Sequence, residues 1–549
     1  NYNTVVGDEA GTAITTGDEN TAVGYRALDA STTANYNTAV GKDAAGATTT
    51  GNSNTAMGRF ALLTNTEGDA NTALGRDALR ANTTADNNTA VGYASLTANT
   101  TGASNTAVGY NAVAANTTGI QNTSIGGFAL ASNTTAAGNT AIGFGTLYTN
   151  TTGASNTAVG LNALNLSTTA SNNTAVGMSA LIANTTGDTN TAVGKDALKS
   201  NTTGTNNQAF GTRSLDANTT GASNVAVGDQ ALGANTTADN NTAVGTNALL
   251  SNTTGANNTG LGVGAMDSNT TGASNVAVGA NALDANTTAA NNTAVGFDAL
   301  TANTTGHSNV AVGSLAGDAM TTANNNTALG HGSLGANTTG IENVALGAGA
   351  GERITTGNYN ICIGYVSGAH AVHLATGVGN VIIGDYADVS ATDSDYANVI
   401  GFNVTGAGTY TTVGEGTNDI RAAHGTATWA TVSDQRYKKD IVDSTAGLSF
   451  INALQPRTFK YKTLGELPET FNAYKADSTK VFKNSDTNHG FIAQEIKAAI
   501  DADSSIADGF KLWDERDDGS MEVAEAALIP VLVKAIQELT ARLETLEGE

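Results

Sequence analysis

Asn105 to Gln121 reads N-T-A-V-G-Y-N-A-V-A-A-N-T-T-G-I-Q, and this seventeen-residue cassette decides the fold of most of the chain. Its first residue recurs as asparagine every seventeen residues from Asn3 to Asn360, without an insertion. Twenty-one such steps give twenty-two cassettes in register. A short fixed period held over so much of a chain is typical of a solenoid, in which each repeat is one structural unit stacked on the next.

The cassette has three positions that suggest its core. The fourth residue is apolar in all copies, for example Val23, and the ninth is usually leucine, for example Leu28. We expect both to stack into apolar ladders inside the coil. The fifth residue is always glycine, for example Gly24. Glycine is expected where the backbone takes a positive φ or packs too closely for a Cβ.

The cassette is too short for a pair of helices. Alternating T-A-V segments separated by glycine and by N-T-T-G predict short strands and turns, with two parallel strands in each coil. The asparagines at positions one and twelve then lie over identical residues one coil away, and we expect their amides to bond in ladders along the axis.

Composition supports a stacked architecture and excludes several kinds of protein. Aromatic residues make up 5% of the 549 residues, and the three prolines lie outside the repeat. The formal net charge of −24 argues against nucleic acid as a partner. No apolar stretch is long enough for a transmembrane helix, so membrane insertion is not expected. No aromatic cluster or concave site stands out in the repeat region, so the receptor is not predicted.

Few residues suggest metal or redox chemistry. Cys362 is the one cysteine, and at the third position of its cassette it is expected to be a buried, inert thiol. His370 and His373 lie where the period breaks, between Asn360 and the next matching residue, Asn380. Three copies of the pair around an axis could collect a metal, but exposed loop residues are the simpler interpretation. We predict no metal and no cofactor.

The chain begins inside the repeat pattern, with neither an initiator methionine nor a signal peptide. We therefore expect it to be a fragment or a processed product that lacks an N-terminal attachment part.

The cassette resembles the heads of trimeric autotransporter adhesins of the YadA type, through N-T-A-V-G followed by alanine at position eight. The resemblance implies a parallel β-roll with three chains side by side. A physical argument agrees with it, because a narrow coil with little apolar surface gains by burying one face against its neighbours.

The period disappears after Gly408, and 14 of the 24 basic residues lie between Arg436 and Arg542. This segment is predicted to be a separate α+β domain. A helix is expected from Ser444 to the residues before Pro456, a strand over 457–462, a polar loop over 463–488, and a second strand over 490–492 leading into a helix.

A heptad pattern ends the chain and predicts a short coiled coil. Ile at a and Leu at d favour two strands, so the seam supports assembly but argues mildly against a trimer, which is expected from the rod and the family resemblance and not from the heptads. Pro530 is tolerated in the first turn of the helix. The seam residues are Ile529, Leu532, Ile536, Leu539, Leu543 and Leu546.

Four motifs of this domain, in order, resemble the intramolecular-chaperone autoprocessing domain that ends many phage tail spikes and fibres. They are S-D-Q-R-Y-K-K-D-I from Ser433, L-Q-P from Leu454, H-G-F-I-A-Q-E from His489, and the helix from Leu528 to Leu546. The resemblance implies a domain that trimerises, helps the β-structured stalk to fold, and cuts itself off before the serine.

In the resemblance, Ser433 is the nucleophile, Lys438 its base, and Val432–Ser433 the bond that breaks. A serine hydroxyl needs a base, and a lysine can serve when burial keeps it neutral. Lys439 is the alternative base. Tyr437 replaces the aliphatic residue usual in the family, and a serine that merely begins a turn ahead of a basic run is the competing interpretation.

We therefore predict an all-β solenoid shaft over 1–376, an irregular β transition region over 377–432, and a chaperone domain over 433–549. The predicted function is a homotrimeric tail fibre on a virion or in the extracellular space, which binds a host-surface glycan or protein and joins other tail proteins. A bacterial surface adhesin would need a membrane anchor, and an ice-binding solenoid a flat Thr-x-Thr face. A glycan-degrading tailspike would need a carboxylate pair that the repeats do not keep.

Overall fold

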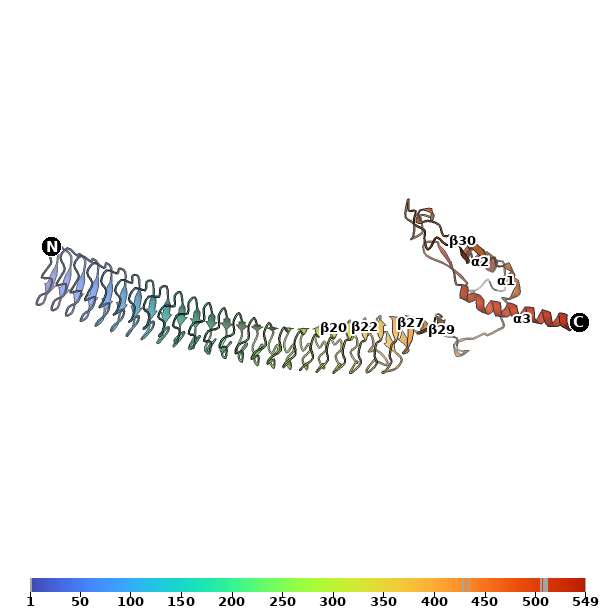
Figure 1. Ribbon diagram of the computed structural model, residues 1–549, viewed down its shortest axis with the longest axis horizontal. Helices are drawn as coiled ribbons and strands as arrows, with labels where there is room; N and C mark the ends of the chain where they lie inside the picture. Colours follow the sequence, from blue (N-terminus) through green and yellow to red (C-terminus); the bar gives the residue numbers. More distant parts are fainter. Residues whose placement is uncertain are drawn as a thin grey trace. The chain divides into compact units, whose positions relative to one another are not determined.

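The computed structural model describes residues 2–426, 429–431, 433, 435–503, 506 and 512–548. It divides into two compact units, Asn1–Val432 and Ser433–Glu549. The first unit is an elongated stack of coils, drawn from blue to orange in Figure 1. The second unit contains the α-helices that the structure describes. The predicted β-solenoid with a small C-terminal α+β domain ending in a helix is confirmed.

Each cassette contributes one three-residue strand. β1 is Thr4–Val6, β2 is Thr21–Val23, and each later strand begins seventeen residues on, up to β22, Ile361–Ile363. Neighbouring strands pair in parallel with equivalent residues opposite one another, as Thr106 lies opposite Thr123. The stack continues through β23 (Val381–Ile383) and β25 (Asn398–Phe402), which makes about 24 parallel turns.

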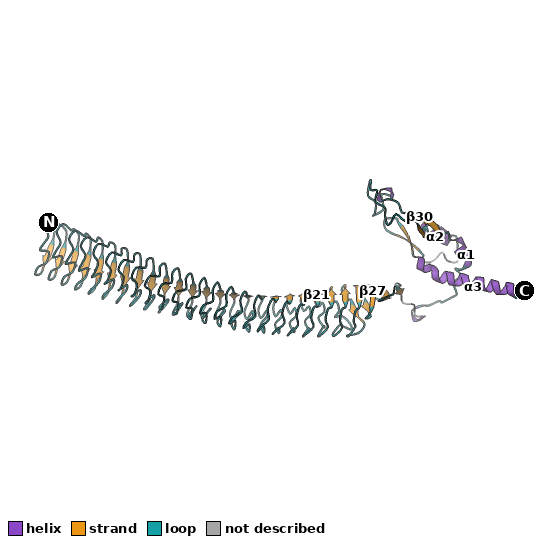
Figure 2. Ribbon diagram, in the orientation of Figure 1, coloured by secondary structure: helices purple, strands orange, loops and turns teal. Residues whose placement is uncertain are grey.

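The prediction of two strands per coil is wrong. Figure 2 shows one short strand per coil, in orange, and the rest of each cassette as loop, in teal. Backbone hydrogen bonds still join successive coils outside the strands, for example from Leu28 N–H to Ala44 O at 3.1 Å. The backbone at the ninth position is left-handed, with a φ of 52° at Leu28, so it cannot follow an extended strand.

The expectation for the fourth position is also wrong. The alanine at position three is buried in the interior, as at Ala22, whereas the residue at position four points outward and is partly exposed, as at Val23. Alternate side chains of a strand lie on opposite faces, and the narrow interior takes the smaller one. The ninth position fulfils its prediction, because Leu28 is fully buried.

We call the outward side of β1–β22 the sheet face. It consists of the residues at positions two and four of the twenty-two cassettes, mostly threonine at position two and valine, leucine or isoleucine at position four. None of these residues is charged. The sheet face is therefore a continuous, uncharged and partly apolar surface along the shaft.

The asparagine ladders form as predicted. At position one, Asn122 Oδ1 accepts hydrogen bonds from the backbone N–H of Asn139 at 3.0 Å and from its Nδ2 at 3.3 Å. At position twelve, Asn133 Nδ2 donates to Asn116 Oδ1 at 2.9 Å. These amides are buried, and the ladders satisfy backbone groups that the turns leave unpaired.

The glycine at position five is required by both reasons that the sequence suggested. Gly109 has a φ of 140°, and a Cβ placed on it would lie 2.5 Å from the carbonyl oxygen of Gly126 in the next coil. An L-residue is strained in that conformation, and the neighbouring backbone has no room for it.

The last coils absorb the break in the period without losing their pairing. The extra residues after β22 form a loop in which the N–H groups of Ala371, Val372 and His373 donate to Asp388 Oδ2, at 2.7, 3.0 and 3.2 Å. A two-stranded pair, β24 (Asp388–Val389) and β26 (Thr405–Gly406), lies beside the main sheet. β27 (Tyr410–Glu415) pairs in parallel with β25 and is followed by the antiparallel strands β28 (Asn418–Ala423) and β29 (Ala430–Thr431).

The C-terminal unit is built from three helices and two small antiparallel sheets among its described residues. The helices are α1 (Leu448–Ala453), α2 (Ala493–Asp501) and α3 (Leu528–Glu547), with short 3-10 turns η1 (Gln435–Tyr437), η2 (Leu464–Glu466) and η3 (Glu525–Ala527). β30 (Arg457–Phe459) pairs with β31 (Asn488–Gly490), and β32 (Trp513–Glu515) pairs with β33 (Met521–Val523). The core contains Ala446, Phe450, Ile496, Ile500, Ile506, Leu512, Leu528 and Val531.

The predicted elements of this unit are present with shifted ends. The first helix begins at Leu448 and not at Ser444, because Glu538 Oε2 of α3 accepts the N–H of Leu448 at 2.8 Å and caps the helix there. The first strand ends at Phe459, and the second occupies 488–490, two residues earlier than predicted. Pro530 lies in the first turn of α3, as predicted.

Candidate processing site in the C-terminal unit

The polar contact that matters most for chemistry joins Ser433 and Lys438. Lys438 Nζ donates a hydrogen bond of 2.8 Å to Ser433 Oγ. The short turn η1 brings the two residues together, because the Lys438 N–H bonds to Gln435 O at 3.0 Å and turns the chain back. Both side chains are exposed.

This contact provides the distance that proton transfer needs, but not the burial that would keep a lysine neutral. No bond from Lys439 to Ser433 is found among the described residues, so the geometry favours Lys438 as the base. Val432 would supply the carbonyl group of the predicted cleavage bond, and it lies outside the described residues. Asp434, the second residue of the motif that begins at Ser433, also lies outside them.

The residue that follows the second motif forms an ion pair with the third motif. Arg457, at the start of β30, binds the Glu495 carboxylate with its Nε at 2.9 Å and a terminal nitrogen at 2.7 Å. The hydrogen bond from Arg457 lowers the pKa of Glu495 and raises that of Arg457. Gln455 Oε1 accepts a further bond from Arg457 at 2.5 Å. These contacts therefore hold the L-Q-P and H-G-F-I-A-Q-E segments together, which is a structural role.

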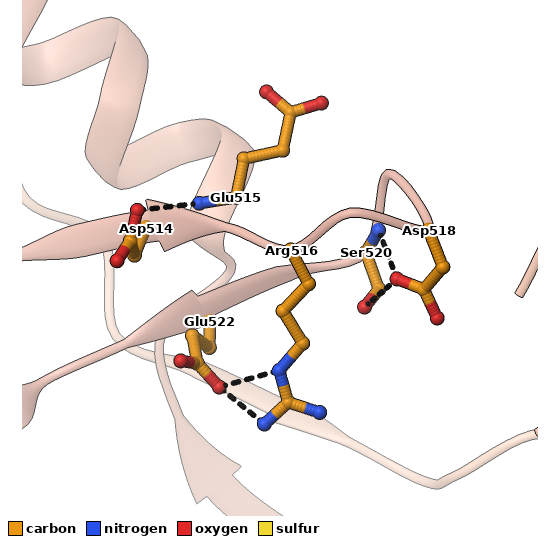
Figure 3. Close-up of polar contacts among 6 residues, drawn as sticks. All are labelled: Asp514, Glu515, Arg516, Asp518, Ser520 and Glu522. Carbon is orange, nitrogen blue, oxygen red and sulfur yellow. Dashed lines mark hydrogen bonds and ion pairs between the residues drawn. The ribbon is translucent and has the colours of Figure 1, made fainter. Parts of the chain in front are cut away.

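The hairpin β32–β33 carries a strongly held carboxylate at its turn (Figure 3). Asp518 accepts hydrogen bonds from the hydroxyl of Ser520 at 2.6 Å, from the Asn472 N–H at 3.0 Å and from the Ser520 N–H at 2.9 Å. Together these donors lower the pKa of Asp518 to about 2. Arg516 and Glu522 pair across the hairpin. A carboxylate with so low a pKa is a poor proton acceptor, so we assign Asp518 to holding the 463–488 loop against the hairpin.

The heptad residues of α3 share one exposed face. The neighbouring stripe of the helix packs on the core through Leu528, Val531 and Ala535, each one residue before a seam residue. The six seam residues are between 43% and 73% exposed. The predicted seam is therefore accessible to another chain.

The other predicted chemistry-bearing residues form no centre. Cys362 is fully buried, and burial raises the pKa of its thiol to about 12, so the expected inert thiol is confirmed. His370 is exposed and packs edge-on against Tyr386, at 4.8 Å between ring centres. Among the described residues, no three His, Cys, Asp or Glu side chains could hold a metal ion. Nor does any helix in those ranges have the length and apolarity to cross a membrane.

The expectation that the shaft has no aromatic cluster is wrong. Five rings from consecutive coils touch in a row along the shaft, beside an open hollow. In the sequence, these rings recur at intervals of about one cassette, and this spacing could have predicted the cluster. The pattern is hard to recognise because the rings occupy three different cassette positions, six, seven and ten. The rings are Tyr93, Tyr110, Phe128, Phe144 and Tyr148.

Comparison with protein families identifies one segment. A model of the family described as chaperone of endosialidase matches residues 433–503, which begin at the serine of the candidate site. The match supports an intramolecular chaperone role for the C-terminal unit. Searches of curated proteins and of solved structures found no match to this chain.

Proposed function

We propose that this chain is the trimeric shaft of a phage tail fibre or related virion appendage that contacts a host surface. Its C-terminal unit drives trimer assembly and then cuts itself off before Ser433. The observation that carries the proposal is the match to the endosialidase chaperone, which begins at a serine that already contacts a lysine.

The sheet face supports side-by-side association of three shafts. Its residues at position four include side chains as exposed as Leu261, at 45%, and Leu346, at 43%. Leaving such a ladder in water is unfavourable, whereas burial against an equivalent ladder removes apolar area from water without desolvating a charge. Two neighbouring copies are the occupants that share its length and period.

The regularity of the shaft explains why a chaperone is needed. Each coil fits any other coil almost equally well, so three chains can associate in many wrong registers. A C-terminal trimer held by the α3 seams would align the three chains in the same register before their shafts associate. The six exposed seam residues are the surface available for this contact.

In the proposed cleavage, the acyl group of Val432 moves from the backbone nitrogen of Ser433 to its hydroxyl oxygen. A neutral Lys438 takes the proton of the Ser433 hydroxyl, and Oγ attacks the carbonyl carbon of Val432. The peptide C–N bond breaks, the Ser433 amine takes up a proton, and an ester remains. Water then hydrolyses the ester, which leaves a carboxylate on Val432 and frees the Ser433 hydroxyl. Because both side chains are exposed in the single chain, we place the required burial in the assembled trimer.

Two measurements test the proposal. Intact mass determination compares the wild type with Ser433→Ala after assembly, and we expect the wild type alone to lose its C-terminal unit. Sedimentation compares the full chain with a chain truncated after Val432, and we expect trimers only from the full chain. A wild type that stays full length contradicts cleavage, and trimeric rods from the truncated chain contradict the chaperone role.

A further inference from the structure

A row of touching aromatic rings runs along the shaft, outside strand positions two and four that make up the sheet face, and we call it the aromatic ledge. Tyr93 stacks on Tyr110 with 5.4 Å between ring centres, and Tyr110 meets Phe128 edge-on at 5.1 Å. Phe128 in turn meets Phe144 at 5.8 Å and Tyr148 at 6.2 Å. The ledge thus spans four successive coils.

The rings of the ledge are open to solvent. Phe144 is 57% exposed, Tyr110 51% and Tyr148 40%. Their cassette positions carry charged residues elsewhere in the shaft, such as Lys42 and Asp267. These positions therefore face water along the rod, and an exposed group of rings on them indicates a binding surface.

A hollow of about 300 Å³ opens at the C-terminal end of the ledge. Phe128, Phe144 and Tyr148 form its aromatic side, and Asn162 and Asn165 its polar side. Asn165 Nδ2 donates to the carbonyl oxygen of Gly145 at 2.7 Å, which fixes its amide. No hydrogen bond of the Asn162 amide is found among the described residues, so it has donors and an acceptor to offer.

Glycine keeps the floor of the hollow open. A Cβ at Gly145 would lie 2.7 Å from Asn162 Oδ1 and would displace that amide. Gly127 likewise leaves the face of Phe144 uncovered, because a Cβ there would touch the ring at 3.4 Å.

The ledge carries little charge, and the charged group recorded on it is Arg76, whose guanidinium carbon lies 5.5 Å from the centre of the Tyr93 ring, at the N-terminal end away from the hollow. Residues 87–187 contain no Asp, Glu, Lys, Arg or His, a run of 101 residues in a chain of net charge −24. None of the residues that line the hollow is charged, so an anionic ligand there would find no cation to pair with, and a cationic ligand no carboxylate. The ligand that fits is uncharged.

We propose that the aromatic ledge and its hollow bind a neutral carbohydrate. The apolar C–H faces of a pyranose ring lie against aromatic faces, and its hydroxyls exchange hydrogen bonds with amides and tyrosine hydroxyls. An apolar partner would leave the Asn162 amide desolvated and unpaired. The inference rests on the proposed attachment function and names its ligand class and its site.

Three copies in a trimer would present three ledges. Weak single-site binding would then be strengthened by simultaneous engagement of a repetitive surface polysaccharide.

The test uses the full chain as purified on an array of immobilised neutral, sialylated and uronate-containing oligosaccharides, with phosphatidylcholine vesicles as a further probe. The double variant Phe144→Ala/Tyr148→Ala removes the aromatic side of the hollow. Phe297→Ala is the matched control, because Phe297 occupies the same cassette position as Phe144 and is 54% exposed, but it lies outside the uncharged run. Sedimentation and circular dichroism check that all variants keep the wild-type fold.

We expect binding to neutral oligosaccharides that changes little between low and high salt. The double variant should lose about tenfold or more of its affinity, and the control less than about twofold. Three results would each overturn the inference. They are no binding to neutral oligosaccharides, binding to acidic oligosaccharides or vesicles in their place, and an equal loss of affinity in the double variant and the control. If the chain trimerises and cleaves but binds no glycan, the site assignment fails and the proposed assembly stands. If the chain does not trimerise, the array still decides the site.

Discussion

Asn122 Oδ1 accepts two hydrogen bonds from Asn139 in the next coil, one from the backbone N–H at 3.0 Å and one from Nδ2 at 3.3 Å. The same carboxamide donates through its Nδ2 to Ala136 O at 2.9 Å. One buried side chain thus connects a turn of its own coil to the strand of the next.

Asn122→Ala is predicted to destabilise the shaft by about 1–3 kcal/mol, because it leaves the Asn139 N–H buried without an acceptor. Chemical denaturation followed by circular dichroism measures the change. Thr118→Ala is the control, since Thr118 is exposed and should change stability by less than about 0.5 kcal/mol. Equal effects of the two substitutions would contradict a structural role for the ladder.

Gly109→Ala is predicted to disrupt its coil at a cost on the order of 4 kcal/mol. It combines a strained φ of 140° with a Cβ only 2.5 Å from the next carbonyl oxygen. Gly46→Ala is the control, because a Cβ there meets its nearest neighbour at 3.4 Å, an ordinary contact. Calorimetry of both variants checks the prediction, which fails if Gly109→Ala unfolds at the wild-type temperature.

Lys438→Arg is predicted to slow release of the C-terminal unit by about 10²-fold or more. Arginine keeps the positive charge and the donor groups but cannot give up its proton to act as a base. Lys439→Arg should cleave like the wild type. Time-resolved mass spectrometry of both variants measures the rates, and the opposite pattern would assign the base to Lys439.

The aspartates at position ten of neighbouring coils are predicted to make the shaft more stable as the pH falls from neutral. Burial raises the pKa of Asp267, and burial followed by the charges of Asp267 and Asp298 raises that of Asp284. A carboxyl whose folded pKa exceeds its unfolded value binds its proton more tightly when folded. Stability is therefore gained as the pH falls through the folded pKa, down to about 4.

Asp284→Asn should accordingly stabilise the shaft at pH 7, by about a few tenths of a kcal/mol because the site is partly solvated. The advantage should vanish below about pH 4. Denaturation at several pH values measures it, with the exposed Asp229→Asn as the control for removal of one charge. A gain that does not depend on pH would refute the explanation.

Ile536→Asp is predicted to abolish trimers of the full chain, because it places a charge in the seam that the proposal buries. Gln537→Asp adds the same charge one residue away, on an exposed position outside the seam, and should leave the trimer intact. Sedimentation equilibrium distinguishes the outcomes. A trimeric Ile536→Asp protein would show that the seam is not the assembly surface.

Much of the shaft was predictable because its period forces equivalent residues into contact. Once Asn122 recurs as Asn139, parallel stacking places the two amides one coil apart, and the glycine in every copy indicates a backbone constraint. The candidate site was identified from its motif, which named Ser433 and Lys438 by resemblance. Their hydrogen bond required the turn η1, which sequence spacing alone does not specify.

The sequence by itself therefore determined the repeat, its register, the two ladders and the separate C-terminal domain, since each depends only on which residues recur. The tertiary structure alone decided which side chains of the strand point inward. Val23 lies outside and Ala22 inside because a narrow coil with a left-handed turn at Leu28 has room for one large residue per layer. The same choice leaves the sheet face uncovered, and the stacking of the coils brings the rings of the aromatic ledge into contact, so the two surfaces on which the proposals rest come from packing.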